Sequence, residues 1–517
     1  MDLPLFRFLR PRSPEAIPET DARFYTRLFW TWLILRTLVW TAATYLTAWN
    51  PPLDVAEMLA WGRDWAWGYS KHPPLPAWIA DSAVFLFGGS IWGVYFASYV
   101  VIGICFWASW RLGRELFSRR QAFFAVLALE GLVYFHFDAY ELNHNVLLAG
   151  TWALTVLCFY RALRGESNHA WLALGICMGL AMLSKYSAGF LFLAMLLYMI
   201  FHPAVRGWWK RAGPYLAGSV AFLIFLPHAW WCLNNNLGPL HHMLHKSKVN
   251  EHAWWHHVRY PAYFLIFQLL RLAPVLLILV PLTGWRWRLR KLAPEQRFGR
   301  DFLLAIALGP VALHVLFSLI LGIEIRDQWG FQLWTFMGVV VLFFAEVRPA
   351  DGRLVKAGRL AFTFTAMFLA AMVARNLFGP MLGGRPTRVH FPGGPLAEQV
   401  DRIWKQRYGE SIPIVVSNDG FMVDSVSWYL PGRPPVFMPD LPQETPGVTD
   451  TELNTKGGVV LWNLETGEEL SRSFRARFPS ARRLEPVSIP YHLSWRLPPL
   501  RVGIALVPPS SENLARH

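Results

Sequence analysis

The amino-acid sequence predicts a mostly α-helical protein that crosses a membrane about eleven times and ends in a small α/β domain. Hydrophobic residues make up 54% of the 517 residues and charged residues only 16%, whereas soluble proteins carry about 25% charged residues. Long apolar runs recur up to residue 378, and only strand-length runs follow them. This balance excludes an ordinary soluble enzyme.

The membrane spans are predicted from apolar runs, because a helix that crosses a bilayer needs about 20 mostly apolar residues. The runs that meet this need lie near 28–48, 91–110, 120–137, 143–163, 170–184, 187–202, 213–231, 259–283, 301–321, 329–346 and 358–378. The stretch 76–89 is apolar but short and follows two prolines, so we interpret it as an interfacial or re-entrant helix. A count of about eleven to thirteen spans stays open.

The orientation of the spans follows from their loops, because cytoplasmic loops are rich in Lys and Arg. The cation-rich loops are 111–120, 161–169, 203–212, 284–300 and 347–357. This pattern places them, together with the tail 1–27, in the cytoplasm. The formal net charge of +15 therefore reflects topology and argues against a nucleic-acid partner.

The character of the chain changes after the membrane module, which is predicted to occupy residues 28–378. Residues 379–394 form a Gly/Pro-rich linker, and residues 395–517 form a small α/β domain. Its predicted elements are a helix over 396–409 and strands over 412–417, 457–462 and 501–509. An odd number of spans places this domain outside. It has no phosphate-binding glycine loop and no His/Cys cluster, so we predict an accessory role.

The first external loop, residues 49–90, holds several charged side chains in its polar part, 49–75. The pattern from Asp54 to Trp67 predicts an amphipathic helix on the membrane. Its apolar residues, Val55, Met58 and Leu59 among them, are expected to face lipid. Two interpretations stay open for its acids: solvated groups on a structural helix, or parts of a catalytic site.

The same loop contains a set of residues at characteristic spacing: Asp54, Ala56, Trp61, Gly68, Tyr69 and His72-Pro73-Pro74-Leu75. This set resembles the first periplasmic loop of GT-C glycosyltransferases, in the bacterial family 39 branch related to protein O-mannosyltransferases and aminoarabinose transferases. The resemblance is specific in this loop and weak elsewhere within 28–350. One departure is that the acid usually following the first Asp is Val55 here, with Glu57 two residues on.

The resemblance implies a GT-C architecture in a bacterial inner membrane, with the active site and the C-terminal domain in the periplasm. Such enzymes move a sugar from a polyprenyl-phosphate carrier to an acceptor hydroxyl, and Asp54 is implied as the general base of an inverting displacement. The implied acceptor is a lipid or glycolipid. The amino-acid sequence of the loop most resembles branches that modify lipid A or lipopolysaccharide core, including those that transfer galacturonic acid. No cofactor is required, and nothing in the sequence supports a divalent metal.

Cations near the external surface are candidate ligands of the donor phosphate, because the leaving phosphate is anionic. Lys185 lies between two apolar runs, where a charge is costly; snorkelling to the interface is the alternative. Arg326 lies beside Glu324 and Asp327, so a local ion pair is the alternative there. Lys71 completes the set.

Further substrate contacts are expected from the first external loop and from the external turn 135–148. Related enzymes place a second Asp in that turn where this sequence has Asn145. The candidate substrate-binding residues are therefore Glu57, Tyr69, His72, Asp138, Glu141 and Asn145.

A His-rich segment follows at 241–257. Pairs such as His241/His245 and His252/His256 have the helical spacing of metal ligands. No carboxylate or Cys pattern completes such a site, so no metal ligand is assigned. The neighbouring Trp254 favours anchoring at the membrane interface instead.

Other function classes stay open on the sequence alone. A transporter or flippase for a lipid-linked envelope precursor would also have many spans and buried charges. Transporters typically contain internal repeats and sites near the bilayer midplane, and neither is apparent here. A protein O-glycosyltransferase and an inactive scaffold are further alternatives.

Overall fold

The computed structural model describes residues 19–165, 168–248, 253–285, 287–347, 351–383, 386–445, 447–466, 472–492 and 497–510. The chain forms two compact units. The first contains Met1–Thr41, Phe96–Tyr140 and His144–Ala371. The second contains Ala42–Tyr95, Glu141–Asn143 and Met372–His517. Helices α1 (Glu19–Thr47), α4 (Trp92–Leu116) and α14 (Asp351–Gly383) have residues in both.

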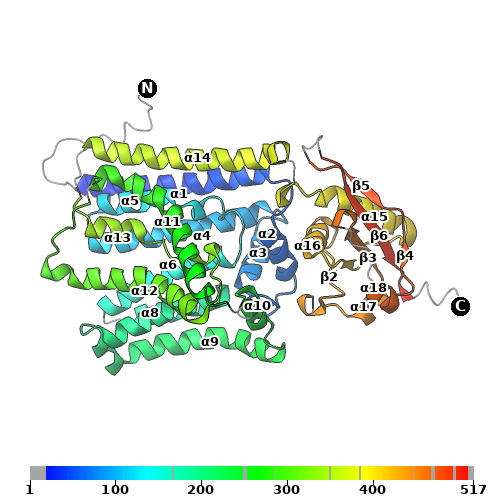
Figure 1. The fold of residues 1–517 in the computed structure, drawn as a ribbon, viewed down its shortest axis with the longest axis horizontal. Helices are drawn as coiled ribbons and strands as arrows, with labels where there is room; N and C mark the ends of the chain where they lie inside the picture. The colour runs from blue at the N-terminus through cyan, green and yellow to red at the C-terminus, as the bar shows by residue number, and fades with distance from the viewer. Residues whose placement is uncertain are drawn as a thin grey trace. The chain divides into compact units, whose positions relative to one another are not determined.

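The first unit is helical. Besides parts of α1, α4 and α14 it contains α5 (Arg119–Leu127), α6 (His144–Arg164), α7 (Asn168–Ser184), α8 (Ala188–Phe201), α9 (Ala212–Asn234), α10 (Gly238–Lys246), α11 (His256–Thr283), α12 (Arg297–Leu321) and α13 (Met337–Phe344). Helix α8 packs against α12, and α12 packs against α11 (Figure 1). The helices of this unit pack against one another, and many large apolar side chains of α9, α11 and α12 stay exposed.

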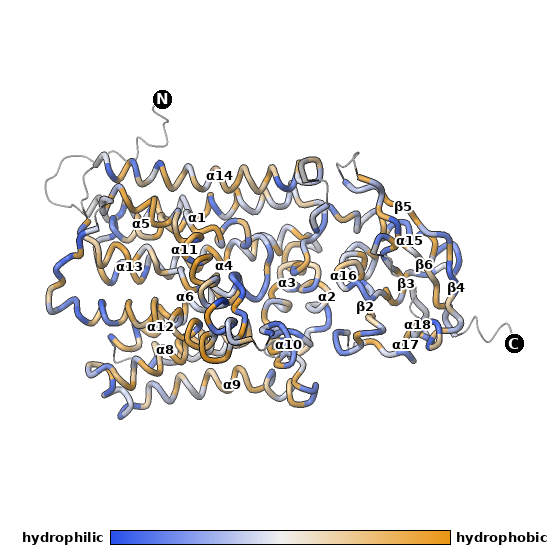
Figure 2. Tube along the Cα trace, in the orientation of Figure 1, coloured by the Kyte–Doolittle hydropathy of each residue, from blue (hydrophilic) through white to orange (hydrophobic). Residues whose placement is uncertain are grey.

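The protein is a multi-pass membrane protein. Within the described residues, six helices are long and apolar enough to cross a bilayer: Trp92–Leu116, His144–Arg164, Ala212–Asn234, His256–Thr283, Pro294–Leu321 and Gly352–Met381. Shorter apolar helices occupy Leu75–Leu86, Asn168–Ser184 and Ala188–Phe201. Figure 2 shows apolar residues along the long helices and polar residues gathered in the loops. The total of eleven spans stays a prediction.

Two predicted spans are not continuous helices. In the run 120–137, α5 ends at Leu127 and two 3-10 turns follow, Ala128–Gly131 (η2) and Val133–Phe135 (η3). In the run 329–346, only α13 is α-helical. Each short helix has fewer than ten residues and is about 14 Å long or less, which is half the thickness of a bilayer core.

The break in the first of these runs coincides with a buried carboxylate, Glu130 in η2. One of its oxygens accepts a hydrogen bond from Arg36 Nε at 2.9 Å, and the other accepts from Thr365 Oγ1 at 2.8 Å. A buried charge requires such partners. Directly after it, Gly131 lies so close to α11 that an added Cβ would be 2.5 Å from the Val275 nitrogen.

The second unit contains a mixed sheet. Its strands are β1 (Val415–Val416), β2 (Val436–Phe437), β3 (Gly458–Asn463), β4 (Arg482–Arg483), β5 (Val487–Ile489) and β6 (Leu500–Val507). The order is β2-β1-β3-β6-β4, with β5 also paired to β6. Strand β1 is parallel to β2 and β3, whereas β6 is antiparallel to β3, β4 and β5. The strands predicted at 412–417, 457–462 and 501–509 are confirmed.

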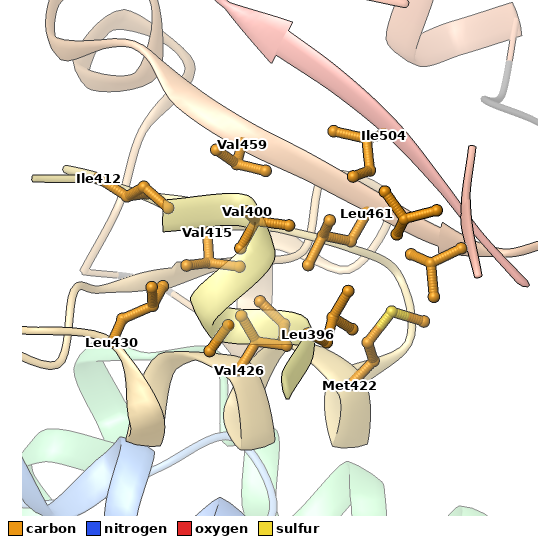
Figure 3. Packing of buried hydrophobic residues seen from close by; sticks show 14 of the residues in the cluster. Leu396, Val400, Ile412, Val415, Met422, Val426, Leu430, Val459, Leu461 and Ile504 are labelled. Atoms are coloured by element: carbon orange, nitrogen blue, oxygen red, sulfur yellow. The ribbon is translucent and has the colours of Figure 1, made fainter. Parts of the chain in front are cut away.

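Side chains alternate across this sheet and form a core on each face. Val459 and Leu461 point to the face covered by α15 (Gly393–Tyr408) and α16 (Gly420–Tyr429), as Figure 3 shows. Val460 and Trp462 point to the other face, toward Phe474 of α18 (Arg472–Arg477). Helix α17 (Asp450–Lys456) adds Leu453 to that second cluster. The helix predicted at 396–409 is α15.

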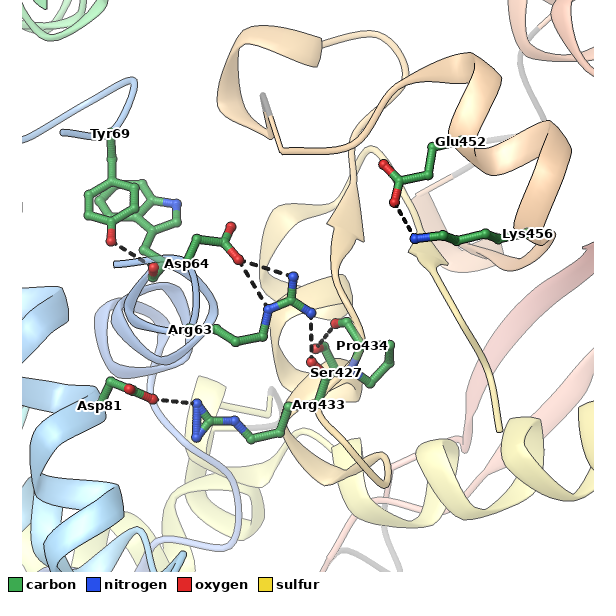
Figure 4. A network of polar contacts seen from close by, with 10 residues as sticks. Arg63, Asp64, Tyr69, Asp81, Ser427, Arg433, Pro434, Glu452 and Lys456 are labelled. Atoms are coloured by element: carbon green, nitrogen blue, oxygen red, sulfur yellow. Dashed lines mark hydrogen bonds and ion pairs between the residues drawn. The ribbon is translucent and has the colours of Figure 1, made fainter. Parts of the chain in front are cut away.

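The first external loop belongs to the same unit as this sheet. It forms α2 (Leu53–Gly62) and α3 (Leu75–Leu86), and α2 packs against α16. Arg63 Nη1 donates to the backbone oxygen of Arg433 at 2.9 Å, and Arg433 Nη2 lies 2.7 Å from Asp81 Oδ1 (Figure 4). The loop and the C-terminal segment are thus joined within this unit by helix packing and by polar contacts.

Candidate active site

Helix α2 positions Asp54 in its first turn, two residues after Pro52 at the N-cap. A carboxylate is favoured at this end of a helix, because the unpaired backbone N–H groups carry partial positive charge. Asn143 Nδ2 donates a hydrogen bond to Asp54 Oδ2 at 2.7 Å. Asn143 is buried and Asp54 is half-buried, so the amide orients one oxygen of the carboxylate.

The apolar face of α2 is not directed at lipid as the sequence analysis expected. Val55 and Met58 are fully buried and Leu59 is 2% exposed, because α2 packs against α3 and α16 of its own unit. Trp65 and Trp67, which follow the helix, are exposed instead. The helix is therefore part of a protein core.

Lys71 is held between two carboxylates. Its Nζ lies 2.8 Å from Glu57 Oε1 and 2.8 Å from Glu444 Oε2. Burial lowers the pKa of Lys71, but the two carboxylates outweigh that effect, and the pKa is raised overall. Burial also raises the pKa of Glu57, which Lys71 offsets only in part. The charge of Lys71 is thus compensated inside the protein, and a phosphate would compete with two acids for it.

Tyr69 and His72 shape the loop around α2. The Tyr69 hydroxyl donates to the Trp61 backbone oxygen at 2.6 Å, and the two rings stack with centroids 4.8 Å apart. The Tyr69 backbone N–H donates to the His72 oxygen at 3.2 Å. Tyr69 is 6% exposed, and burial raises its pKa. In this arrangement its hydroxyl is engaged by the protein itself.

A cavity of about 220 Å³ lies within the second unit beside α2. We call it the acid-rich cavity. Its charged lining residues are Glu57, Lys71, Arg388, Asp419, Asp424 and Glu444. Four of these six are acids, and the partly buried Asp424 has a pKa well above its usual range, mainly because of burial.

In the first unit the structure brings together Lys185 and Asn145, two of the predicted site residues. Lys185 lies in the turn between α7 and α8, and its Nζ donates to Asn145 Oδ1 at 2.6 Å. The same Nζ lies 5.4 Å from the centroid of the Trp329 ring, within range of a cation–π contact. Both contacts fix the position of the ammonium group.

Arg326 does not form the local ion pair that was the alternative interpretation. Glu324 pairs instead with Lys248 at 3.0 Å, and Asp327 pairs with Arg271. In the part of the chain that the structure describes, the Arg326 side chain makes no hydrogen bond or ion pair, and it is exposed. Its guanidinium is accordingly open to a ligand.

A cavity of about 730 Å³ in the first unit includes Arg326 in its wall. We call it the cationic cavity. Its basic lining residues are Lys248, His256, Arg259 and Arg326, and its aromatic ones include Tyr260 and Tyr263. The Arg259 guanidinium lies 5.2 Å from the centroid of the Tyr263 ring. Positive groups and aromatic walls at one place suit an anionic ligand attached to an apolar body.

Two predicted substrate contacts, Asp138 and Glu141, lie in different units. Asp138 Oδ2 lies 3.2 Å from Arg271 Nη1, and the Arg271 guanidinium also covers the Tyr134 ring at 4.4 Å. Glu141 is partly buried and lies two residues before Asn143. Asp138 is therefore held by an arginine, and Glu141 is near the partner of Asp54 in sequence.

The His-rich segment is described only in part. His241 and His245 lie on α10, His256 stacks on Tyr260, and His252 falls outside the described residues. Among the residues that the structure describes, no three His, Cys, Asp or Glu side chains gather in a way that could hold a metal ion.

Comparisons with known proteins by family model, by sequence and by fold all find similarity to glycosyltransferases. Residues 71–231 match a family model described as dolichyl-phosphate-mannose-protein mannosyltransferase. The lipopolysaccharide core galacturonosyltransferase RgtA of Rhizobium johnstonii is 24% identical over 482 residues, covering 89% of this chain and 93% of that protein. RgtB of the same organism, also a lipopolysaccharide core galacturonosyltransferase, is 24% identical over 462 residues and covers 85% of this chain and 89% of its own.

Among solved structures, ArnT from Cupriavidus metallidurans bound to undecaprenyl phosphate superposes with a TM-score of 0.64 at 14% identity. The match covers 94% of this chain and 98% of that chain. The protein is a membrane glycosyltransferase, and its fold is similar to that of ArnT. The resemblance to GT-C glycosyltransferases that the sequence indicated is thereby confirmed.

Several residues of this glycosyltransferase were missed by the sequence analysis. Arg271 was hidden in the apolar run 259–283, where a lone charge is itself a functional signal. Lys248 and Arg259 lie in or beside the His-rich segment and escaped notice there. Asp424 and Glu444 belong to a domain predicted to be accessory, and no local pattern links them to Lys71.

Proposed function

We propose that this glycosyltransferase moves a sugar from a polyprenyl-phosphate carrier to a hydroxyl of lipid A or of the lipopolysaccharide core, with inversion at the anomeric carbon. The observation that carries the proposal is the cationic cavity, in which Arg326 is exposed and without an ion pair among the described residues. A cation without a partner at an aromatic-walled cavity suits a lipid phosphate. The curated relatives, which act on lipopolysaccharide core, support the acceptor.

The chemical step assigns Asp54 as general base. The acceptor oxygen attacks the anomeric carbon of the donor sugar and Asp54 takes its proton, while the bond from that carbon to the phosphate oxygen breaks. The polyprenyl phosphate leaves with both electrons of the broken bond, and a single displacement inverts the configuration. The Asn143 amide binds one carboxylate oxygen at 2.7 Å, which orients the other toward the acceptor proton.

The leaving phosphate is stabilised by cations of the first unit. We assign Arg326 as the principal ligand, with Lys248 and Arg259 of the same cavity as further cations. Lys185, oriented by Asn145, contacts the donor near the segment that holds Trp329. Cations fixed in place lower the free energy of the transition state, because negative charge develops on the phosphate as the bond breaks.

The orientation follows from the loops. Loop 49–75 carries few cations, and the second unit joins this loop to the C-terminal segment. Both therefore face the periplasm, with the cation-rich loops in the cytoplasm of a bacterial inner membrane. We retain 28–378 as the membrane module with 49–90 as its first periplasmic loop, 379–394 as the linker and 395–517 as the periplasmic α/β domain.

A protein acceptor is the second candidate. The family model that matches residues 71–231 describes protein mannosyltransferases, which glycosylate proteins by that description. Mass spectrometry of lipid A, core and envelope proteins from a deletion strain separates the two. A sugar missing from lipid A or core supports our proposal, and a sugar missing only from proteins overturns the acceptor assignment.

The base is tested by transfer from a labelled undecaprenyl-phosphate sugar in nanodiscs. We expect Asp54→Asn to lower transfer by about 100-fold or more, the usual effect of removing a general base. Asp64→Asn is the matched control, because Asp64 is an exposed acid of the same loop that pairs with Arg63. Full activity of Asp54→Asn contradicts the base assignment. If the native protein consumes no polyprenyl-phosphate sugar with any acceptor, the proposed reaction is wrong.

A further inference from the structure

The acid-rich cavity has no role in the transfer step described above, yet its wall is shared with the helix that carries Asp54. Leu53 and Glu57 line the cavity, and Asp54 lies between them in the same turn of α2. Because a helix rises about 1.5 Å per residue, Asp54 and Glu57 are about 4.5 Å apart along its axis. A ligand in this cavity thus lies next to the proposed base.

The charges of the cavity exclude an anion. Lys71 is already engaged by Glu57 and Glu444, and Asp419 and Asp424 add further acidic groups. The remaining cation, Arg388, lies over the Phe421 ring at 4.5 Å. A phosphate placed here would meet several acids and one partly shielded cation, so the phosphate end of the donor belongs elsewhere.

The polar groups of the cavity suit hydroxyls. The Asp424 carboxyl makes no hydrogen bond or ion pair within the described residues, and burial raises its pKa, so it is protonated over a wider pH range than an exposed acid. A protonated carboxyl both donates and accepts hydrogen bonds. Asp419 Oδ1 accepts from the Met422 backbone N–H at 3.2 Å, which fixes its carboxylate at the start of α16. Together they offer donors and acceptors to one hydroxyl-rich ligand.

The size and the apolar walls narrow the ligand further. Trp61 is held rigid by stacking on Tyr69, and Phe421 provides a second aromatic surface. Aromatic rings pack against the C–H faces of sugar rings, while carboxyl groups bind their hydroxyls. The volume of about 220 Å³ is below the range of about 300 to 1,000 Å³ for drug-sized ligands, which fits one sugar ring.

We propose that the acid-rich cavity binds one uncharged, hydroxyl-bearing sugar residue of the acceptor glycan and so holds the acceptor beside Asp54. This inference rests on the proposed glycosyl transfer for its meaning, but binding in the cavity can be measured without turnover. It assigns Asp424 as a specificity-determining residue for the acceptor and leaves the donor to the cationic cavity.

Two variants of the full-length protein in nanodiscs test the site. Asp424→Asn keeps the shape and some hydrogen bonding, and Asp424→Leu keeps the approximate size without any. The probe is dephosphorylated core oligosaccharide from a deletion strain, observed by saturation-transfer NMR and used as acceptor in the transfer assay. Glu452→Gln is the matched control, because Glu452 forms a surface pair with Lys456 of the same unit (Figure 4).

We expect Asp424→Asn to raise the acceptor KM about tenfold, equivalent to one hydrogen bond, and Asp424→Leu to abolish saturation transfer. The donor KM and the slow hydrolysis of donor by water should stay within twofold of native, which also shows that the variants are folded. Unchanged acceptor KM and oligosaccharide binding in a folded Asp424→Leu overturn the site. So does competition of inorganic phosphate with the oligosaccharide for binding.

Failure of the proposed function gives a different result. The native protein would then consume no donor, and no sugar transfer would be detected for any variant. Oligosaccharide binding that Asp424→Leu abolishes would still support a sugar site in the cavity. Absence of oligosaccharide binding by a native protein that transfers sugar to the same oligosaccharide would overturn the site alone.

Discussion

The two cavities of this glycosyltransferase contain charges of both signs but leave different groups available to a ligand. In the cationic cavity, Glu324 and Asp327 are each paired with a basic side chain, and Arg326 stays open. In the acid-rich cavity, the one lysine is paired with two acids, and Asp424 stays open. Composition alone would not reveal this difference. The pairing of the side chains determines which group is left to contact a ligand.

This contrast separates the two substrates of a transfer reaction by their chemistry. A lipid-linked donor carries a phosphate, which requires cations. An acceptor sugar carries hydroxyls, which bind well to carboxyl groups and aromatic rings. If each cavity holds one substrate, changes to the first should alter donor kinetics and changes to the second should alter acceptor kinetics.

The largest effect on this contrast is expected from Arg326→Ala. We predict that kcat/KM for the donor falls by about 100-fold or more, as when one fixed donor to a developing anion is removed. The acceptor KM should change less than twofold. Steady-state kinetics with each substrate varied provides the measurement, and Lys210→Ala, an exposed basic residue of the same unit, is the control. A larger effect on the acceptor than on the donor contradicts the division of the two cavities.

The second effect concerns the ion pairs of Lys71. Lys71→Met leaves Glu57 and Glu444 close together without a counter-charge, so we expect a loss of about 1 to 2 kcal/mol in the free energy of unfolding. The groups are about one-fifth exposed, so solvent screening keeps the loss below that of a fully buried pair. Combining Lys71→Met with Glu57→Gln should restore part of it. Additive losses in a double-mutant cycle, measured by thermal unfolding, would show that the pair is not coupled.

The fold of the second unit was predictable where the pattern is local. The runs 412–417, 457–462 and 501–509 contain β1, β3 and β6, because alternating or continuous apolar residues specify strands over a few positions. Helix α15 followed from its apolar period in the same way. The breaks in 120–137 and 329–346 were not predictable, since Glu130 meets Arg36 and Thr365 only in the folded chain.

The candidate site was predictable only in part, because some of its contacts form only in the folded chain. The sequence indicated Asp54 through the motif of the first external loop. It indicated Lys185 and Arg326 because each is a charged residue close to apolar runs. Arg271 gains its significance from Asp138 and Asp327, which lie more than 50 residues away. Asp424 gains its significance from a cavity wall that includes Glu57 and Lys71. No local signal shows that Lys71 is compensated by Glu444 of the C-terminal segment. Residue types were predictable, but pairings were not.

A third, smaller effect is a pH dependence of stability. Burial raises the pKa of Asp424 well above its ordinary value of 3.8, so the native state binds more protons than the unfolded state between the two pKa values. Stability must then fall as pH rises through that window. We predict that Asp424→Asn shows a weaker fall of melting temperature than native protein when pH is raised from about 4 toward neutrality. Parallel melting curves for the two proteins would contradict the assignment of a protonated carboxyl to the cavity.

The smallest effect is expected from Lys405→Ala, because Lys405 lines neither cavity. Lys405 pairs with Asp401 at 2.7 Å on the surface of α15, four residues apart, and its side chain is 45% exposed. Such pairs contribute about 0.3 to 0.5 kcal/mol, because water screens the charges and two flexible side chains must be ordered. The free energy of unfolding should therefore change by no more than about 0.5 kcal/mol, with both KM values unchanged. A shift in acceptor KM here would mean that the sheet and its helices transmit changes to the acid-rich cavity, and that the effect of Asp424 substitutions is not local.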